Sequence, residues 1–296
     1  RATVLLPTTG DRGPILKYSV ASLLNQTVDE WELFIIGDGV DEETRITAEE
    51  IAKTDSRIRF FAFSKDDSRG EVNRHQLLME EARGEIVCYL CDRDLYLPNH
   101  LDTMLHVLEH NDIAITLHVP YKPNGRFRFS RRIHPASDFE NGAAFKKNRF
   151  GPLSLTAHTL EAYKRLPFGW RETPKDQLPT DRYMWRQFLE QEWIRFDLVY
   201  KLTVIHLKRG GHPGLSTDQR VELSQKMYDL FCSGAGIERF YESVLHDLLR
   251  NQARRDSNQN FSGARKAISE GNESKTAGFF GGLKKLKSKF FLNKSS

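Results

Sequence analysis

Two aspartates one residue apart, Asp92 and Asp94, follow directly on the apolar run of residues 86–91. In extended backbone, residues i and i+2 project to the same side, so both carboxylates could reach one point. Mg²⁺ or Mn²⁺ is commonly held by one or two carboxylates together with substrate phosphates. The pair therefore predicts a divalent metal site that acts on a phosphate-bearing substrate. The alternative is a solvated turn, which produces the same D-x-D pattern.

The elements that would position this pair are of two alternating kinds. Short apolar segments predict strands at residues 3–8, 31–39, 57–63, 85–91 and 113–119. Amphipathic segments of helical length lie between them, at residues 14–26, 41–55, 71–84 and 98–110. This order predicts an α/β fold with βαβ units wound into a mostly parallel sheet. Ligands bind at the carboxyl ends of the strands in such a sheet, and these ends carry Thr8, Asp38, the segment 65–70 and Asp92.

The second half of the chain is predicted to complete this fold. Residues 119–150 are rich in Pro, Gly and Arg and predict a loop or a small hairpin insert. The elements expected after it are a short segment at 152–158, helices at 159–166 and 182–191, strands at 194–200 and 201–207, and two helices between 216 and 250. We therefore predict a first half of the fold at 1–118, a second half at 119–215, C-terminal helices at 216–250 and a disordered tail at 251–296.

The composition of the 296 residues is that of a soluble globular protein, with 39% hydrophobic and 28% charged residues. The sequence contains no apolar run of about 18 residues, so no membrane-spanning helix is expected. Three cysteines favour a reducing compartment, and a cytoplasmic location is expected. Cys88 and Cys91 form a C-x-x-C within an apolar strand, where two buried thiols are expected in preference to a zinc or redox pair.

Positive charge is concentrated at the C-terminal end. Residues 251–296 hold 10 Lys or Arg and 3 Asp or Glu, whereas residues 1–250 hold 34 basic and 37 acidic residues. The polar, glycine-containing composition of this tail predicts disorder. Its end, LKKLKSKFFLNK, predicts a basic amphipathic segment that contacts an anionic membrane surface peripherally, the alternative being a soluble tail. The charge of the tail says nothing about the ligand of the core, and no nucleic acid partner is expected.

Several motifs in a fixed order give the sequence a specific resemblance. The segments TVLLPTTGDRGPILKYSVASLLNQTVDEWELFIIGDGVDEET and GEVNRHQLLMEEARGEIVCYLCDRDLYLPNHL closely resemble glycosyltransferase family 2, and TDRYMWR resembles a later motif of that family. The resemblance implies the GT-A fold and an inverting, metal-dependent sugar transfer. The substrates would be a nucleotide-diphosphate sugar and a saccharide or lipid-linked acceptor, in polysaccharide or glycoconjugate synthesis. The resemblance also implies that residues 1–118 bind the nucleotide sugar and that residues 119–215 form the acceptor side with the general base. The sequence departs from the family pattern at Gly37, at Asn73–His75 and at Thr180.

The resemblance also implies roles for single residues on the donor side. Thr8 would line the nucleotide pocket and Asp38 would contact the base or ribose. Asp92 would contact the ribose or the metal. The remaining candidates, for the base or diphosphate, are Arg69 and Arg74.

On the metal and acceptor side, the resemblance implies that Asp94 binds Mg²⁺ or Mn²⁺. His206 would be a further metal ligand, with His212 as the alternative. Asp181 would be the general base, with a helix N-cap as the alternative role and Asp176 as the next candidate base.

Two other functions remain open at this point. A sugar-1-phosphate nucleotidyltransferase would have a similar sheet, but the turn PTTGDRGP lacks the Gly- and Arg-rich loop expected of it. A non-catalytic nucleotide-sugar-binding relative is suggested by Gly37 and Thr180, which replace family carboxylates.

Overall fold

The computed structural model of the protein describes residues 1–65, 67, 70–120, 151–177, 179–207, 214–232, 236–242, 245, 246 and 250. Its contacts divide the chain into two compact units, Arg1–Phe240 and Tyr241–Ser296. Nearly all of the described residues belong to the first unit. The predicted insert lies outside the described residues from position 121 on, and so does the whole predicted tail at 251–296.

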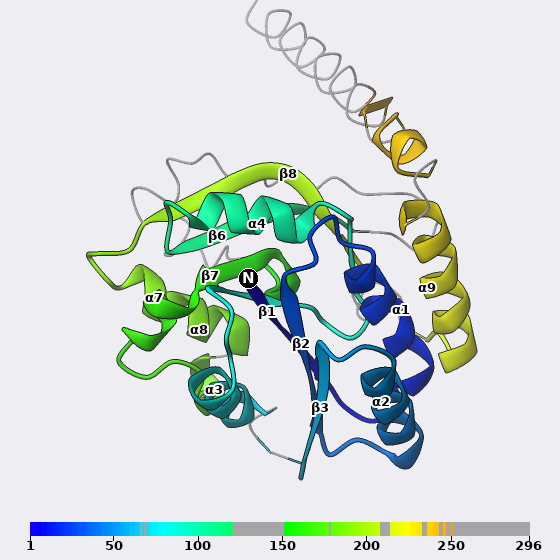
Figure 1. Ribbon diagram of the computed structural model, residues 1–296, viewed down its shortest axis with the longest axis horizontal. Coiled ribbons are helices and arrows are strands. Elements are labelled where there is room, and N and C mark those ends of the chain that lie inside the picture. Colours follow the sequence, from blue (N-terminus) through cyan, green and yellow to red (C-terminus); the bar gives the residue numbers. More distant parts are fainter. Residues whose placement is uncertain are drawn as a thin grey trace, which may run out of the picture. The chain divides into compact units, whose positions relative to one another are not determined.

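The described residues form alternating strands and helices through the first half of the chain (Figure 1). The strands are β1 (Ala2–Thr8), β2 (Trp31–Asp38), β3 (Ile58–Phe63), β4 (Ile86–Tyr89), β5 (Leu95–Tyr96), β6 (Ile113–Pro120), β7 (Thr156–Thr159) and β8 (Phe196–His206). The α-helices are α1 (Gly13–Leu24), α2 (Glu42–Thr54), α3 (Glu71–Glu80), α4 (His100–Leu108), α7 (Leu160–Lys164), α8 (Thr180–Leu189) and α9 (Thr217–Cys232), and the 3₁₀ turns are η1 (Leu153–Leu155) and η2 (Lys175–Gln177).

In the part of the chain that the structure describes, eight strands form one mixed sheet in the order β3-β2-β1-β4-β7-β6-β8-β5. The strands β3, β2, β1 and β4 are parallel neighbours, so their carboxyl ends meet at one edge. Strand β7 pairs antiparallel with both β4 and β6, whereas β6 and β8 are parallel. The α/β fold with a mostly parallel sheet is confirmed, and β7 adds an antiparallel strand in its middle.

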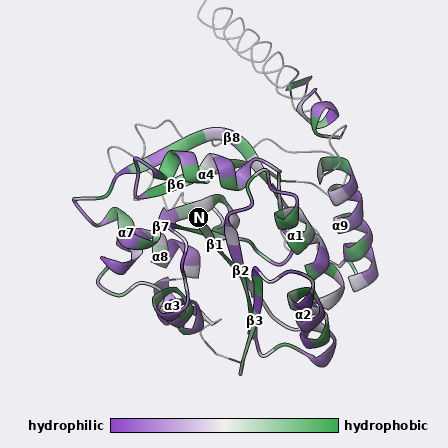
Figure 2. Cartoon of the chain, viewed as in Figure 1, coloured by the Kyte–Doolittle hydropathy of each residue, from purple (hydrophilic) through white to green (hydrophobic). Residues whose placement is uncertain are grey.

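Helices cover both faces of the sheet because its central strands are apolar on both sides. One hydrophobic cluster joins Val4 and Leu6 of β1 to residues of α1, α2 and α4. A second cluster joins Leu5 of the same strand to residues of α3, α7 and α8. The covering helices carry hydrophilic and hydrophobic residues side by side (Figure 2). Burial of these apolar side chains contributes roughly 25 cal/mol per Å² of area removed from water.

The C-terminal part of the sheet differs from the prediction in one respect. The two strands expected at 194–200 and 201–207 are a single strand, β8, of 11 residues. Its register against β6 shifts on both sides of Leu117, so β8 has bulges that interrupt its alternation. The boundary predicted between residues 200 and 201 was therefore wrong, because the strand continues through these bulges.

Helix α9 confirms the first of the two helices predicted between 216 and 250. It packs on α1, where the ring centroids of Tyr18 and Tyr228 lie 6.4 Å apart.

Among the described residues, none of the helices combines the length and the apolar character that crossing a membrane requires. Cys88 is buried and Cys91 is partly buried, and both are free thiols, as predicted.

Two buried histidines should make the stability of this fold fall in weak acid. His158 accepts a hydrogen bond from Tyr89 at Nε2 (2.7 Å) and donates from Nδ1 to the carbonyl of Thr159 (3.0 Å). Burial lowers the pKa of His158 to about 4 and that of His100 to about 3. Unfolded histidine has a pKa near 6.5, so between these values the unfolded chain binds more protons. The stabilisation is complete above about pH 6.5 and is lost as the pH falls.

The measurement is the free energy of unfolding in urea between pH 6.5 and 5. Each imidazole should contribute a slope of about 1.4 kcal/mol per pH unit well below its unfolded pKa. His158→Gln should reduce that slope, and His106→Gln, at an exposed position of α4, should not. Identical slopes for the wild type and His158→Gln would contradict the prediction.

Candidate active site

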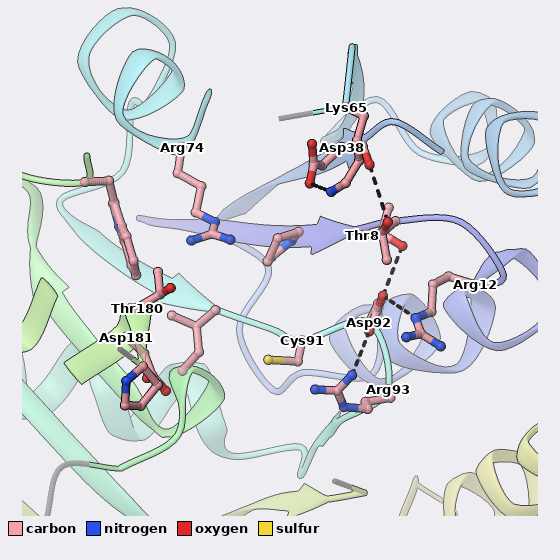
Figure 3. Close-up of a pocket in the computed structure, with 15 residues that line it drawn as sticks. Thr8, Arg12, Asp38, Lys65, Arg74, Cys91, Asp92, Arg93, Thr180 and Asp181 are labelled. Atoms are coloured by element: carbon pink, nitrogen blue, oxygen red, sulfur yellow. Dashed lines mark hydrogen bonds and ion pairs between the residues drawn. The ribbon is translucent and has the colours of Figure 1, made fainter. Parts of the chain in front are cut away.

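A cavity of about 750 Å³ lies at the carboxyl ends of β1, β2 and β4, a size typical of small-molecule sites. The N-terminal turn of α8 forms a separate wall of it (Figure 3). The residues that line it are Pro7, Thr8, Thr9, Arg12, Asp38, Lys65, Arg74, Cys91, Asp92, Arg93, Leu153, Trp170, Pro179, Thr180 and Asp181. Five of the predicted site residues are thus brought together, namely Thr8, Asp38, Arg74, Asp92 and Asp181.

Asp92 connects the turns that follow β1 and β4. Its carboxylate accepts a hydrogen bond from Thr8 Oγ1 at 3.2 Å, and Arg12 Nε lies 3.1 Å from the same oxygen. Burial raises the pKa of Asp92, and the neighbouring Arg93 and Arg12 oppose that rise. Arg12 was missed in the sequence, although its place in the first strand-to-helix turn was a signal that could have found it.

Asp38, the last residue of β2, forms an ion pair with Lys65 beyond the end of β3. Gly39, which follows Asp38, has a φ of +58°, a conformation that favours glycine. A Cβ at this position would lie 2.5 Å from Cβ of Lys65. The close approach of the two strand ends therefore requires glycine, and it holds the buried Asp38 carboxylate at the cavity wall.

Arg74 reaches into the cavity from α3 (Figure 3). Its guanidinium carbon lies 4.8 Å from the ring centroid of Trp170, and the indole Nε1 donates a hydrogen bond to the Tyr89 hydroxyl at 2.9 Å. Burial lowers the pKa of Arg74, although Glu71, Tyr89, Cys91 and Asp38 oppose that effect. Trp170 thus forms a fixed wall of the cavity beside a buried cation.

Asp181 lies in the first turn of α8, which begins at Thr180 with Pro179 as the N-cap residue. Its carboxylate accepts a hydrogen bond from the backbone N–H of Arg182 at 2.9 Å. An N-cap side chain would accept from a residue two or three positions further along, so the alternative cap role is wrong. Burial raises the pKa of Asp181, which makes its carboxylate a stronger base. The next candidate, Asp176, is exposed in η2 and does not line the cavity.

Asp94 and His206 lie next to each other, but behind the cavity wall. Asp94 is fully buried, and its carboxylate lies 2.9 Å from His206 Nδ1. It also accepts hydrogen bonds from Ser154 Oγ (2.6 Å) and from the backbone N–H of Leu207 (3.1 Å). Strand β4 ends at Tyr89, and the Asp94 N–H bonds the Cys91 carbonyl across a turn. The expectation that extended backbone would make Asp92 and Asp94 converge was therefore wrong.

The residues proposed as metal ligands do not fit a Mg²⁺ or Mn²⁺ site as they stand. Both oxygens of Asp94 accept hydrogen bonds from protein donors, and one oxygen of Asp92 is shared by Thr8 and Arg12. The other oxygen of Asp92 lies 3.9 Å from a guanidinium nitrogen of Arg93. Among the described residues there is no group of three or more His, Cys, Asp or Glu side chains that could hold a metal ion.

Two predicted site residues, Arg69 and His212, lie outside the described residues. Lys65, Cys91 and Arg93 also line the cavity, and no role was predicted for them from the sequence. Their positions could have indicated them, because Cys91 is the last residue of a predicted strand and Lys65 and Arg93 follow the end of one.

Two solved structures have a fold similar to that of this chain. S. aureus TarS 1-349 is 14% identical, with a TM-score of 0.55, and the match covers 74% of this chain and 68% of that chain. The mannosyltransferase PcManGT from Pyrobaculum calidifontis, solved with GDP-Man and Mn²⁺, is 15% identical with a TM-score of 0.52 over 94% of this chain and 83% of that chain. These likenesses confirm the predicted GT-A type of fold.

Curated relatives match over shorter stretches. The GalNAc(5)-diNAcBac-PP-undecaprenol beta-1,3-glucosyltransferase of Campylobacter jejuni is 26% identical over 105 residues, which is 36% of this chain and 33% of the relative. The chain spans between 14% and 36% of the length of the curated relatives it matches. The model of Glycosyl transferase family 2 matches residues 3–168, more than half of the chain. The chain therefore belongs to glycosyltransferase family 2.

Proposed function

We propose that the protein transfers a sugar from a nucleotide-diphosphate sugar to an acceptor hydroxyl with inversion at the anomeric carbon. The observation that carries this proposal is the cavity at the strand ends, where the carboxylate of Asp181 lies on a different wall from Lys65, Arg12 and Arg93 (Figure 3). In this arrangement a carboxylate on one wall of the cavity could accept the proton of a hydroxyl. Basic side chains on another wall could bind the diphosphate that the hydroxyl displaces. Membership of the family supports the same reaction.

The proposed reaction is a single displacement. Asp181 takes the proton of the acceptor hydroxyl while the oxygen attacks the anomeric carbon, and the diphosphate leaves from the opposite side with the bonding electrons. The raised pKa of Asp181 favours this proton transfer. The displacement needs no covalent enzyme intermediate.

The donor is proposed to lie along the first half of the chain and the acceptor along the second. Residues 1–118 supply the strand-end side chains from Pro7 to Arg93, and residues 119–215 supply Leu153, Trp170 and the first turn of α8. Thr8, Asp38 and Asp92 would bind the nucleoside, while Arg74 and Arg69 would approach the base or diphosphate. The acceptor would be a saccharide or a lipid-linked saccharide, as the name of the Campylobacter relative states for that protein.

The test is product analysis with a panel of nucleotide-diphosphate sugars and saccharide acceptors. Release of a nucleoside diphosphate together with glycosylated acceptor is the expected result. Release of pyrophosphate from a sugar 1-phosphate and a nucleoside triphosphate would instead identify a nucleotidyltransferase. Tight donor binding with no turnover on any acceptor would identify a non-catalytic relative.

Asp38→Asn should weaken donor binding with little effect on the chemical step. A hydrogen bond from a ligand to a charged group contributes about 1.5–3 kcal/mol, so the dissociation constant of the donor should rise about 10-fold to 100-fold. Calorimetric titration with the donor measures this change, and kcat at saturating donor should stay within a few-fold of the wild type. Asp29→Asn, at an exposed position before β2, is the matched control. An unchanged dissociation constant would show that Asp38 does not contact the nucleotide.

A further inference from the structure

One face of helix α3 contacts residues 169–173, here called the wall segment. Glu71, Arg74 and His75 lie at positions i, i+3 and i+4 of α3, and side chains at this spacing lie on one side of a helix. The guanidinium carbon of Arg74 lies 4.8 Å from the ring centroid of Trp170, which lines the cavity. Through α3, the first half of the chain therefore contacts a segment of the second half that forms part of the cavity wall.

Glu71 binds the end of the wall segment, although it is only 1% exposed. One carboxylate oxygen accepts a hydrogen bond from Thr173 Oγ1 at 2.8 Å, and the other accepts one from the backbone N–H of Thr173 at 3.3 Å. Burial lowers the pKa of Arg74, and the charge of Glu71 is the foremost of those that oppose this effect. A buried charge is costly unless it is paired and hydrogen-bonded, so both interactions keep this carboxylate in place.

The beginning of the wall segment is held by other groups. The backbone N–H of Trp170 donates a hydrogen bond to the Tyr163 hydroxyl at 2.9 Å, and that hydroxyl lies 2.8 Å from Nδ1 of His75. The carbonyl of Gly169 accepts a hydrogen bond from Nε2 of Gln187, on α8, at 2.8 Å. These contacts fix Trp170 independently of the contact that Glu71 makes.

The end of the wall segment leads to the proposed base. Thr173 is followed by the turn η2 and then by Pro179, the N-cap residue of α8, whose first turn carries Asp181. No side chain caps this end of α8, so the connection before it determines where the helix begins. In the described part of the chain, both hydrogen bonds that Thr173 donates go to Glu71. The contact between Glu71 and Thr173 therefore anchors the connection that precedes Asp181.

We propose that Glu71 is a positioning residue of the transfer reaction, which acts through Thr173 to hold the first turn of α8, and with it Asp181, in place. This inference rests on the proposed function. Glu71 does not line the cavity, so its role does not include a contact with either substrate. A misplacement of about 1 Å at a reacting group can cost about 10²-fold in rate. Loss of this contact should therefore lower kcat much more than it weakens donor binding.

The test removes the two partners of the contact separately and together. Thr173→Val deletes the hydroxyl and keeps the shape of the side chain. It should lower kcat about 10-fold to 100-fold and change the dissociation constant of the donor by less than about threefold. Glu71→Gln should lower kcat as well, and the double variant should lower it no further than the stronger single variant, because both substitutions act on one contact. Thr54→Val and Glu50→Gln, at exposed positions of α2, are the matched controls.

A conservative variant separates positioning from a general loss of stability. Thr173→Ser keeps the hydroxyl and should recover most of the activity that Thr173→Val loses. All kcat values are measured where urea unfolding curves show each variant to be fully folded. An unchanged kcat in Thr173→Val, no recovery in Thr173→Ser, or a donor affinity that falls as much as kcat would overturn the inference and leave glycosyl transfer in place. Multiplying effects of Thr173→Val and Glu71→Gln in the double variant would do the same. Absence of transfer by the wild type with every donor and acceptor would overturn the proposed function, and this inference with it.

Discussion

Asp181→Asn should lower kcat by about 10²–10⁴ and leave the affinity for the donor nearly unchanged. A positioned general base contributes an effect of this size, and asparagine keeps the shape of the side chain while losing the ability to accept a proton. The hydrogen bond from the backbone N–H of Arg182 can still be accepted by the amide oxygen, so α8 should keep its first turn. The measurements are kcat at saturating substrates and the dissociation constant of the donor by calorimetry.

The pH dependence gives an independent check on Asp181. The base must be ionised to accept a proton, so kcat should fall as the pH drops through its pKa in the complex. Because burial raises that pKa, the fall should begin above the range of an ordinary aspartate. Asp176→Asn, on the exposed turn η2, is the matched control and should behave as the wild type. A fully active Asp181→Asn protein would place the base elsewhere.

Asp94→Ala should destabilise the protein by about 3–5 kcal/mol. The side chain joins the turn after β4 to the end of β8, because it accepts hydrogen bonds from Ser154 and Leu207 and contacts His206. Removing a buried carboxylate leaves these buried donors unsatisfied, at about 1–3 kcal/mol for each. Asp94→Asn should cost less because its amide oxygen can still accept one or two of these bonds. The free energy of unfolding in urea measures both changes.

This experiment separates a structural Asp94 from a metal-binding one. Asp197→Ala removes an exposed carboxylate from the same strand, β8, and should change stability by less than about 0.5 kcal/mol. A metal ligand would behave differently, since its loss would abolish metal-dependent activity while the apo protein unfolded as the wild type does. Unchanged stability of Asp94→Ala would therefore contradict the role that the hydrogen bonds indicate.

The order of apolar and amphipathic segments predicted the donor half of the fold correctly. Strands β1 to β4 and helices α1 to α4 lie where the alternation placed them, within a few residues. Local patterns suffice here because strands β1, β2 and β4 are buried on both faces and the helices bury one face each. The same patterns placed Thr8, Asp38 and Asp92 at one sheet edge, and the cavity confirms that placement.

The sequence by itself determined which residues lie at the carboxyl ends of the parallel strands, because these ends must meet at a common edge of the sheet. The tertiary structure alone decided which side chains at that edge face the cavity. A turn at residues 91–94 separates Asp92 from Asp94, and long-range hydrogen bonds hold Asp94 against β8. Likewise, only the packing of α8 brings Asp181, about 90 positions beyond Asp92, to the same cavity. Such contacts depend on turn geometry and helix packing between distant segments, and no local periodicity encodes them.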